Sequence, residues 1–154
     1  MNNTITEVAF EIDKPNARNR VFTRKAAENA IDKYRPSIEN RRAMGELFVL
    51  RNENDSIDCG NMVNLANVSH IITKLDINAS GQVTVVAEIL ETPSGKMFQK
   101  LMQTNKHKFS YRLIGSLVDE KIDEAEFIAI DLIIYPQQKP CDCSSIIKNE
   151  ENND

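Results

Sequence analysis

One apolar run near the end of the chain constrains the fold more than any other segment. Residues 127–135 read Phe-Ile-Ala-Ile-Asp-Leu-Ile-Ile-Tyr, and Asp131 is the only charge among them. An apolar run of this length is typical of a strand buried on both faces. We expect Asp131 to have a partner there, because an unpaired buried charge is costly. Arg112 is the candidate, in a pair that would be architectural rather than catalytic.

Alternating and apolar runs predict the rest of a sheet. Residues 6–12 alternate as a first strand with Val8, Phe10 and Ile12 on one face. The tripeptide at residues 79–81, Ala-Ser-Gly, favours a hairpin connection. Further strands are predicted at residues 46–50, 63–75, 83–90, 109–118 and 126–135.

Two helices are predicted beside this sheet. Thr23 caps the first, whose apolar residues recur at helical spacing until Pro36 stops it. The second begins at Thr92 with Pro93 in its first turn, and ends near Thr104. The fold class is therefore α+β: an antiparallel, partly closed sheet or barrel with two flanking helices.

Length and composition indicate one domain. The chain has 154 residues, of which 41% are hydrophobic and 27% charged, a balance typical of a folded protein with one core. We expect residues 1–136 to form that domain. Residues 137–154 are polar and lack hydrophobic periodicity, which predicts a flexible C-terminal tail.

Several classes of partner are disfavoured by the sequence. The net charge of −4 and the pI near 5.3 provide no basic field for nucleic acid. No apolar stretch is long enough to span a membrane. Cys59, Cys141 and Cys143 lack further ligands at metal-binding spacing, so we expect free thiols, no metal and no cofactor.

Six segments in order resemble the prohead core proteases of tailed bacteriophages, a family with the herpesvirus-assemblin-like serine protease fold. The resemblance covers roughly residues 14–136 and depends on the order of the segments rather than on one motif. The segments are Asn16-Ala-Arg-Asn-Arg-Val-Phe-Thr23, Met44-Gly-Glu-Leu-Phe-Val-Leu50, Asn67-Val-Ser-His-Ile-Ile-Thr-Lys-Leu75, Glu88-Ile-Leu-Glu-Thr-Pro-Ser-Gly-Lys96, Lys108-Phe-Ser-Tyr-Arg-Leu-Ile-Gly115 and Ile130-Asp-Leu-Ile-Ile-Tyr-Pro136.

The resemblance places the family's nucleophilic serine on Ser110 and its general-base histidine on Val49. The family motif around the histidine has the form Gly-Glu-Leu-x-His-Pro. A serine hydroxyl needs an adjacent base to accept its proton, and valine cannot accept one. The resemblance therefore implies a family member that has lost its catalytic base.

The surroundings of Ser110 also depart from the family motif Gly-x-Ser-Ser-Arg-Gly-x-Gly. Tyr111 stands in place of the second serine, and Lys108 and Leu113 replace two glycines that would let amide groups approach an oxyanion. Arg112 matches the family arginine.

Three interpretations remain open at this point. The first is a non-catalytic capsid-associated structural protein of a phage: an auxiliary, decoration or scaffold-associated component that binds the major capsid protein or other capsid and scaffold proteins. The alternative is an active maturation serine protease in which His70 or His107 serves Ser110. A third reading is an unrelated binding module of the same fold class.

The first reading implies a location in the virion capsid, after assembly in the cytoplasm of the host bacterium. It is compatible with a homo-oligomer, and it implies no membrane and no direct nucleic-acid partner.

Overall fold

The computed structural model describes residues 3–16, 19–52, 55, 57 and 60–136. The predicted tail at residues 137–154 and all three cysteines lie outside these residues. The elements are β1 (Thr4–Glu11), β2 (Val21–Phe22), α1 (Arg24–Glu39), β3 (Met44–Val49), the 3₁₀ helix η1 (Leu65–Asn67), β4 (Val68–Ile77), β5 (Gln82–Ile89), α2 (Pro93–Leu101), β6 (Asn105–Val118) and β7 (Lys121–Pro136).

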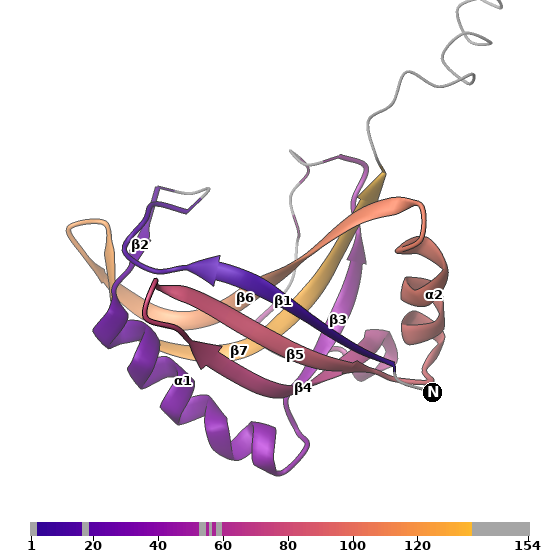
Figure 1. Ribbon diagram of the computed structural model, residues 1–154, viewed down its shortest axis with the longest axis horizontal. Helices are drawn as coiled ribbons and strands as arrows, with labels where there is room; N and C mark the ends of the chain where they lie inside the picture. The colour runs from indigo at the N-terminus through magenta and orange to yellow at the C-terminus, as the bar shows by residue number, and fades with distance from the viewer. Residues whose placement is uncertain (1–2, 17–18, 53–54, 56, 58–59, 137–154) are drawn as a thin grey trace, which may run out of the picture.

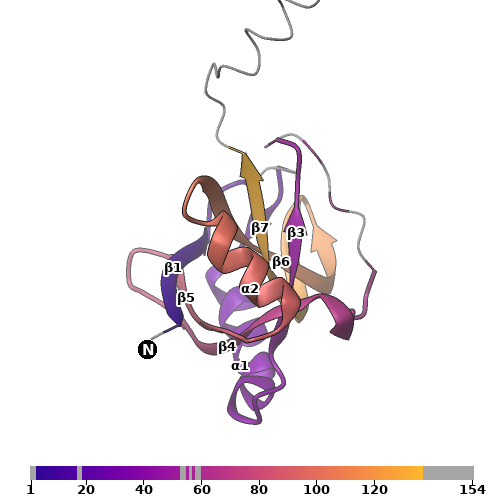
Figure 2. The ribbon, with the colours of Figure 1, turned by 90° about the vertical axis from the view of Figure 1, so that its right-hand side faces the viewer.

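Seven strands form one strongly curled sheet in the order β1-β5-β4-β3-β7-β2, with β6 also paired to β7. Seen from one end, the sheet curls around its core as a partly closed barrel (Figure 2). The predicted α+β class with two helices is confirmed. The sheet is mixed, however, because β7 pairs in parallel with both β2 and β3, while the remaining pairs are antiparallel.

The first strand forms, but one of its predicted core residues is wrong. Val8 is 49% exposed, whereas Ile12, beyond the end of β1, is buried. The cause is an irregularity between Val8 and Phe10 in the pairing with β5. Such a bulge shifts the alternation of side chains by one residue.

Helix α1 begins as predicted, with the hydroxyl of Thr23 accepting from the amide of Ala26. It continues through Pro36, which was expected to end it, as far as Glu39. Pro36 lies in the last turn, and its own carbonyl accepts from the amide of Asn40. Because proline has no N–H, one intrahelical hydrogen bond is missing, namely the bond to the carbonyl of Asp32. Asp32 is an exposed residue.

The β4–β5 hairpin and α2 also lie where the sequence predicts them. The amide of Asn78 donates to the carbonyl of Gln82, and Gly81 has φ 87°, a conformation that glycine adopts without strain. Thr92 caps α2, and Phe98 is its fully buried side chain.

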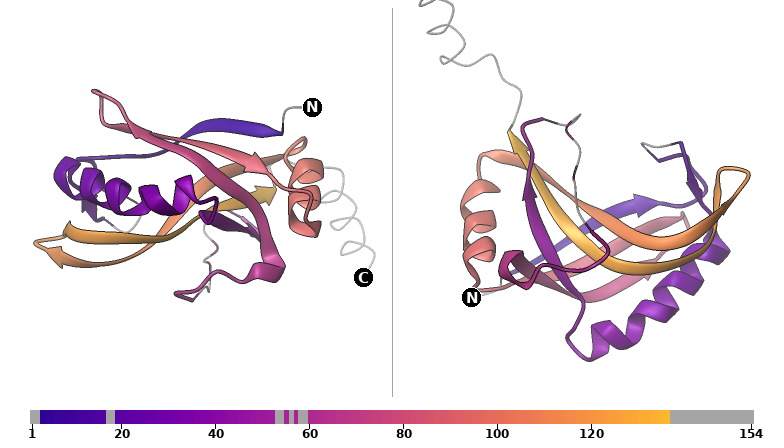
Figure 3. Two further views of the ribbon diagram at one scale, coloured as in Figure 1. Left: turned by 90° about the horizontal axis from the view of Figure 1, so that it is seen from below. Right: turned by 180° about the vertical axis from the view of Figure 1, so that it is seen from behind.

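The two helices take different places around the sheet. Helix α1 packs on the core between β4 and β7, and α2 lies against β4 and β3 near one end of the sheet (Figures 1 and 3). Neither helix has the length and apolar character that a membrane crossing requires, within the residues that the structure describes.

The alternation of side chains gives β3, β6 and β7 two distinct faces. We call inner the face that packs into the core and outer the opposite one. The inner face carries Leu47, Phe109, Ile130, Leu132 and Ile134, and the outer face carries Glu46, Phe48, Ser110, Arg112 and Asp131.

Candidate active site

Ser110, the candidate nucleophile, lies on the outer face of β6. It pairs directly with Asp131 of β7, so the two side chains point to the same side of the sheet. Lys108 and Arg112, two residues away in each direction, share this face.

Val49, the position that the resemblance assigns to the general base, lies on the opposite side of the sheet. It pairs in parallel with Ile134, and Leu47, two residues earlier, pairs with Leu132. These residues belong to the inner face, although Val49 is 56% exposed at the end of its strand. The structure therefore does not bring Val49 and Ser110 together.

His70 is completely buried on the inner side of the sheet, beside the ring of Phe109. Its Nε2 lies 2.8 Å from the carbonyl oxygen of Ile130, and its Nδ1 lies 2.8 Å from the hydroxyl of Ser69. Because a carbonyl only accepts, Nε2 must carry the proton, and Nδ1 accepts from Ser69. Burial lowers the pKa of His70 to about 4, against the opposing effect of the Ile130 carbonyl. His70 is thus a neutral imidazole with both nitrogens occupied.

The position of His70 depends on a glycine. A Cβ on Gly45 would lie 2.3 Å from Nε2 of His70 and 2.3 Å from the carbonyl oxygen of Ile130. Only a residue without a side chain allows this hydrogen bond to pass so close to β3. Gly95 of α2 has a similar role, because a Cβ there would lie 2.9 Å from the carbonyl oxygen of Ser69. Four of the segments that carry the resemblance, at residues 44–50, 67–75, 88–96 and 130–136, therefore meet around Ser69 and His70.

His107 also faces away from Ser110. The two are three residues apart in one strand, and an odd separation puts side chains on opposite faces. The Nε2 of His107 is paired with the carboxylate of Glu7 from β1, and its ring packs edge-on against Phe98. Within the described residues, neither histidine is hydrogen-bonded to Ser110.

Tyr111, which replaces the second serine of the family motif, belongs to an aromatic cluster on the inner face. Its ring centroid lies 4.7 Å from that of Phe10 and 5.6 Å from that of Phe22. Its hydroxyl accepts from the side-chain amide of Asn16 at 3.1 Å. Tyr111 is therefore a packing residue in this structure.

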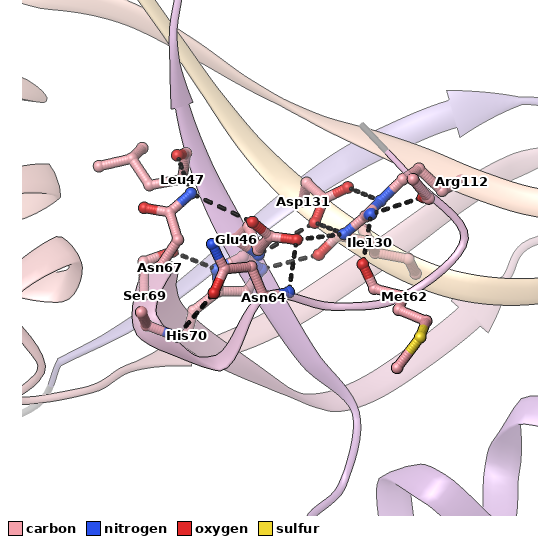
Figure 4. Close-up of polar contacts among 12 residues, drawn as sticks. Glu46, Leu47, Met62, Asn64, Asn67, Ser69, His70, Arg112, Ile130 and Asp131 are labelled. Atoms are coloured by element: carbon pink, nitrogen blue, oxygen red, sulfur yellow. Dashed lines mark hydrogen bonds and ion pairs between the residues drawn. The ribbon is translucent and has the colours of Figure 1, made fainter. Parts of the chain in front are cut away.

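The outer face beside Ser110 holds a buried charged network (Figure 4). As predicted, Arg112 is the partner of Asp131: its Nε and Nη2 donate to the two carboxylate oxygens at 2.7 and 3.0 Å. Nη2 also donates to Glu46 at 3.0 Å. The backbone amide of Glu46 donates to Asp131 at 2.9 Å, which closes the ring.

Sequence reasoning did not identify Glu46 as part of this network. Glu46 is 4% exposed, and its carboxylate accepts from the backbone amide of Asn64 and from the side chain of Asn67. The sequence does contain a signal for Glu46. Glu46 is a charged residue at the start of a predicted strand whose following residues are apolar, and a charge among apolar residues is also what marked Asp131.

The network also fixes a covering segment over the outer face. Nη1 of Arg112 donates to the carbonyls of Gly60 and Met62, at 3.0 and 3.2 Å. The Asn67 side chain donates to the carbonyl of Leu47 and accepts from the hydroxyl of Ser94, both at 2.8 Å. The network thus connects β3, β6 and β7 to residues 60–67 and to α2.

Two carboxylates share one guanidinium here, so the network carries an excess negative charge when both are ionised. Burial raises the pKa of Asp131, and the hydrogen bonds from Arg112 and from the amide of Glu46 oppose that rise. The arrangement can hold β3, β6 and β7 in register, but it offers no imidazole to accept a proton from Ser110. Among the described residues, no group of three or more potential ligands could hold a metal ion.

Comparison with known proteins agrees with this architecture at the level of fold. No protein-family model and no curated protein matches the chain. Among solved structures, the fold is that of a phage capsid assembly protease. One matching structure is the bacteriophage T4 capsid assembly protease, gp21, with a TM-score of 0.71 and 18% identity over 84% of this chain and 80% of that one. The prohead-protease-like fold is confirmed, and at this identity the comparison shows the fold alone.

Proposed function

We propose that this chain is a non-catalytic, capsid-associated protein of a phage that retains the prohead protease fold as a binding scaffold. Its link to capsid assembly is the structural likeness to the T4 capsid assembly protease. Its partners are the major capsid protein or other capsid and scaffold proteins, and its location is the virion capsid.

The arrangement of side chains around Ser110 carries the non-catalytic part of the proposal. Ser110 occupies the outer face, whereas Val49, His70 and His107 belong to the inner side. A general base must be within about 3 Å of the proton that it takes, directly or through one water. Rotation of a side chain cannot meet this condition, because the sheet lies between Ser110 on one face and the two histidines on the other.

The charged groups beside Ser110 are already engaged. Asp131, its direct neighbour across the pair, accepts from Arg112 and from the amide of Glu46. Lys108 lies over the ring of Tyr135, at 5.9 Å from its centroid. These contacts support a structural role for the outer face.

The test is production of the full chain together with its capsid and scaffold proteins in bacteria, in parallel with Ser110→Ala. We expect identical intact masses for both chains, no fragments of the capsid proteins, and the full-length chain in purified particles. Wild-type and Ser110→Ala chains should also react equally weakly with a fluorophosphonate probe, which labels activated serines.

An active protease predicts the opposite results. Fragments of the chain or of the capsid proteins that disappear in Ser110→Ala would refute the proposal, and so would labelling by the probe that depends on Ser110. His70→Gln and His107→Gln would then identify the base. Val49→Ala serves as the matched control, because it should alter none of these readouts under either function.

A further inference from the structure

The β6–β7 hairpin contains a long strand with a free edge. β6 pairs with β7 along its whole length, and in the part of the chain that the structure describes no strand pairs with its other edge. The pairing has two irregularities, and in both the unpaired residue belongs to β7: Ile128 in one and Asp123 in the other. The edge strand itself therefore runs without a bulge from Asn105 to Val118.

Among the described residues, β1 approaches the first part of this edge. β1 reaches it through side chains, with Glu7 paired to His107 and the ring of Phe10 beside that of Tyr111. The far end of the β6–β7 hairpin projects past the end of β1 (Figures 1 and 3).

The projecting part of β6 is unusually apolar for an exposed edge. Ile114, Leu117 and Val118 are 58%, 44% and 53% exposed. Natural proteins protect exposed edges with prolines, with bulges in the edge strand or with inward-pointing charges, because a bare edge recruits further strands. Residues 113–118 of β6, Leu-Ile-Gly-Ser-Leu-Val, have none of these features.

Acidic residues accompany this edge. Glu126 pairs with Ile114, and Glu124 pairs with Ser116, so both carboxylates lie one strand away from the edge. Asp119 and Glu120 form the turn at the tip. Ser116 is small and lies on the same face as both carboxylates, which leaves room for a long side chain to cross β6 toward Glu124 and Glu126.

We propose that residues 113–118 of β6 accept an additional β-strand from a partner whose extended segment alternates apolar residues with lysine or arginine. The backbone of the segment pairs with the free edge of β6, and its apolar side chains lie on the inner face beside Leu113 and Leu117, which pair with the buried Phe127 and Ile122. Its cationic side chains lie on the outer face, which Ser116 shares with Glu124 and Glu126, and they reach these two carboxylates past Ser116. This inference stands on the hairpin alone and does not depend on the proposed function.

The experiment uses the full chain and two capped synthetic peptides of alternating residues, one of lysine and valine and one of glutamate and valine. Binding is measured by calorimetry, and hydrogen exchange of the protein locates the site. We expect the lysine peptide to bind at least tenfold more tightly than the glutamate peptide, and to protect amides within residues 113–118. Two N-methylated versions of the lysine peptide test the strand pairing, one methylated at the odd and one at the even residues. Each version blocks the N–H groups along one edge of the peptide strand, so one of the two should lose binding.

A pair of charge-reversal variants provides the control. Glu124→Lys with Glu126→Lys should invert the preference between the two peptides. Glu28→Lys with Glu39→Lys makes the same change in charge on exposed positions of α1, and should leave the preference unchanged. In the wild type, raising the salt concentration should weaken the binding of the lysine peptide and should not weaken that of the glutamate peptide.

Several results would overturn the proposal. They are absence of binding of the lysine peptide up to about 1 mM, equal binding of the two peptides, unchanged binding of both N-methylated versions, or protection confined to residues outside the hairpin. Unchanged preference in the Glu124→Lys and Glu126→Lys variant would count equally against it.

Discussion

Replacing Arg112 by methionine is the most informative perturbation of the outer face. The substitution keeps a side chain of similar length but removes the five hydrogen bonds to Asp131, Glu46 and the carbonyls of Gly60 and Met62. Asp131 and Glu46 are 2% and 4% exposed, so both carboxylates remain buried without a cation. Breaking a buried ion pair in this way costs about 3–5 kcal/mol of unfolding free energy. For a chain of this length, a loss of about 4 kcal/mol lowers the melting temperature by about 10 °C.

The loss should depend on pH in a definite direction. Without the hydrogen bonds from Arg112, burial raises the folded-state pKa of Asp131 further above its unfolded value. A carboxyl with a raised folded pKa binds more protons in the folded state, so its stabilising contribution disappears as the pH rises through that value. The Arg112→Met variant should therefore lose less stability at pH 5 than at pH 8.

Urea denaturation of the wild type and the variant at both pH values measures these effects. Arg35→Met is the matched control, since Arg35 makes an exposed contact of 3.4 Å with Asp32 and its loss should cost under about 0.5 kcal/mol. Equal losses in the two variants, or a loss for Arg112→Met that is the same at pH 5 and pH 8, would refute the reasoning.

Three further predictions concern the fold. Gly45→Ala should destabilise the protein by more than about 3 kcal/mol in urea denaturation, because its Cβ would lie 2.3 Å from both His70 Nε2 and the Ile130 carbonyl; Gly60→Ala, with nothing within 4 Å, should show no such clash. The His70 imidazole should remain neutral in NMR titration until the pH falls to about 4, and unfolding free energy should fall as the pH drops from about 6.5 towards 4, because the unfolded state binds the proton first; an ordinary titration near 6.5 would contradict this. Thr23→Ala should lower stability by about 1 kcal/mol through loss of the α1 cap, and Thr23→Ser should restore most of it.

Local patterns in the sequence were sufficient for most of the secondary structure. Thr23 and Thr92 identified both helix starts, because capping depends only on residues a few positions apart. The partnership of Arg112 and Asp131 could also be predicted, since a charge inside an apolar strand requires a counter-charge. In each of these cases the physical cause lies within a short segment or in one conspicuous residue.

The remainder depends on pairings between distant segments. The parallel contacts of β7 with β2 and β3 leave no local signature, and the bulge that exposes Val8 is visible only against β5. The same limit applies to the candidate site. Aligned motifs can place Ser110 and Val49 in the expected order, but only the register of β3 and β6 on β7 reveals that they belong to opposite faces.

The tight approach of backbone to backbone at Gly45 and Gly95 has a consequence for finding other chains of this architecture. A side chain at either position would collide with a carbonyl oxygen, at 2.3 Å from Ile130 and at 1.9 Å from Leu90. Neighbouring core residues can be substituted by other apolar residues of similar size, but neither glycine can be substituted by a residue with a side chain. Searches for distant homologues should therefore give these two glycines more weight than the apolar residues around them.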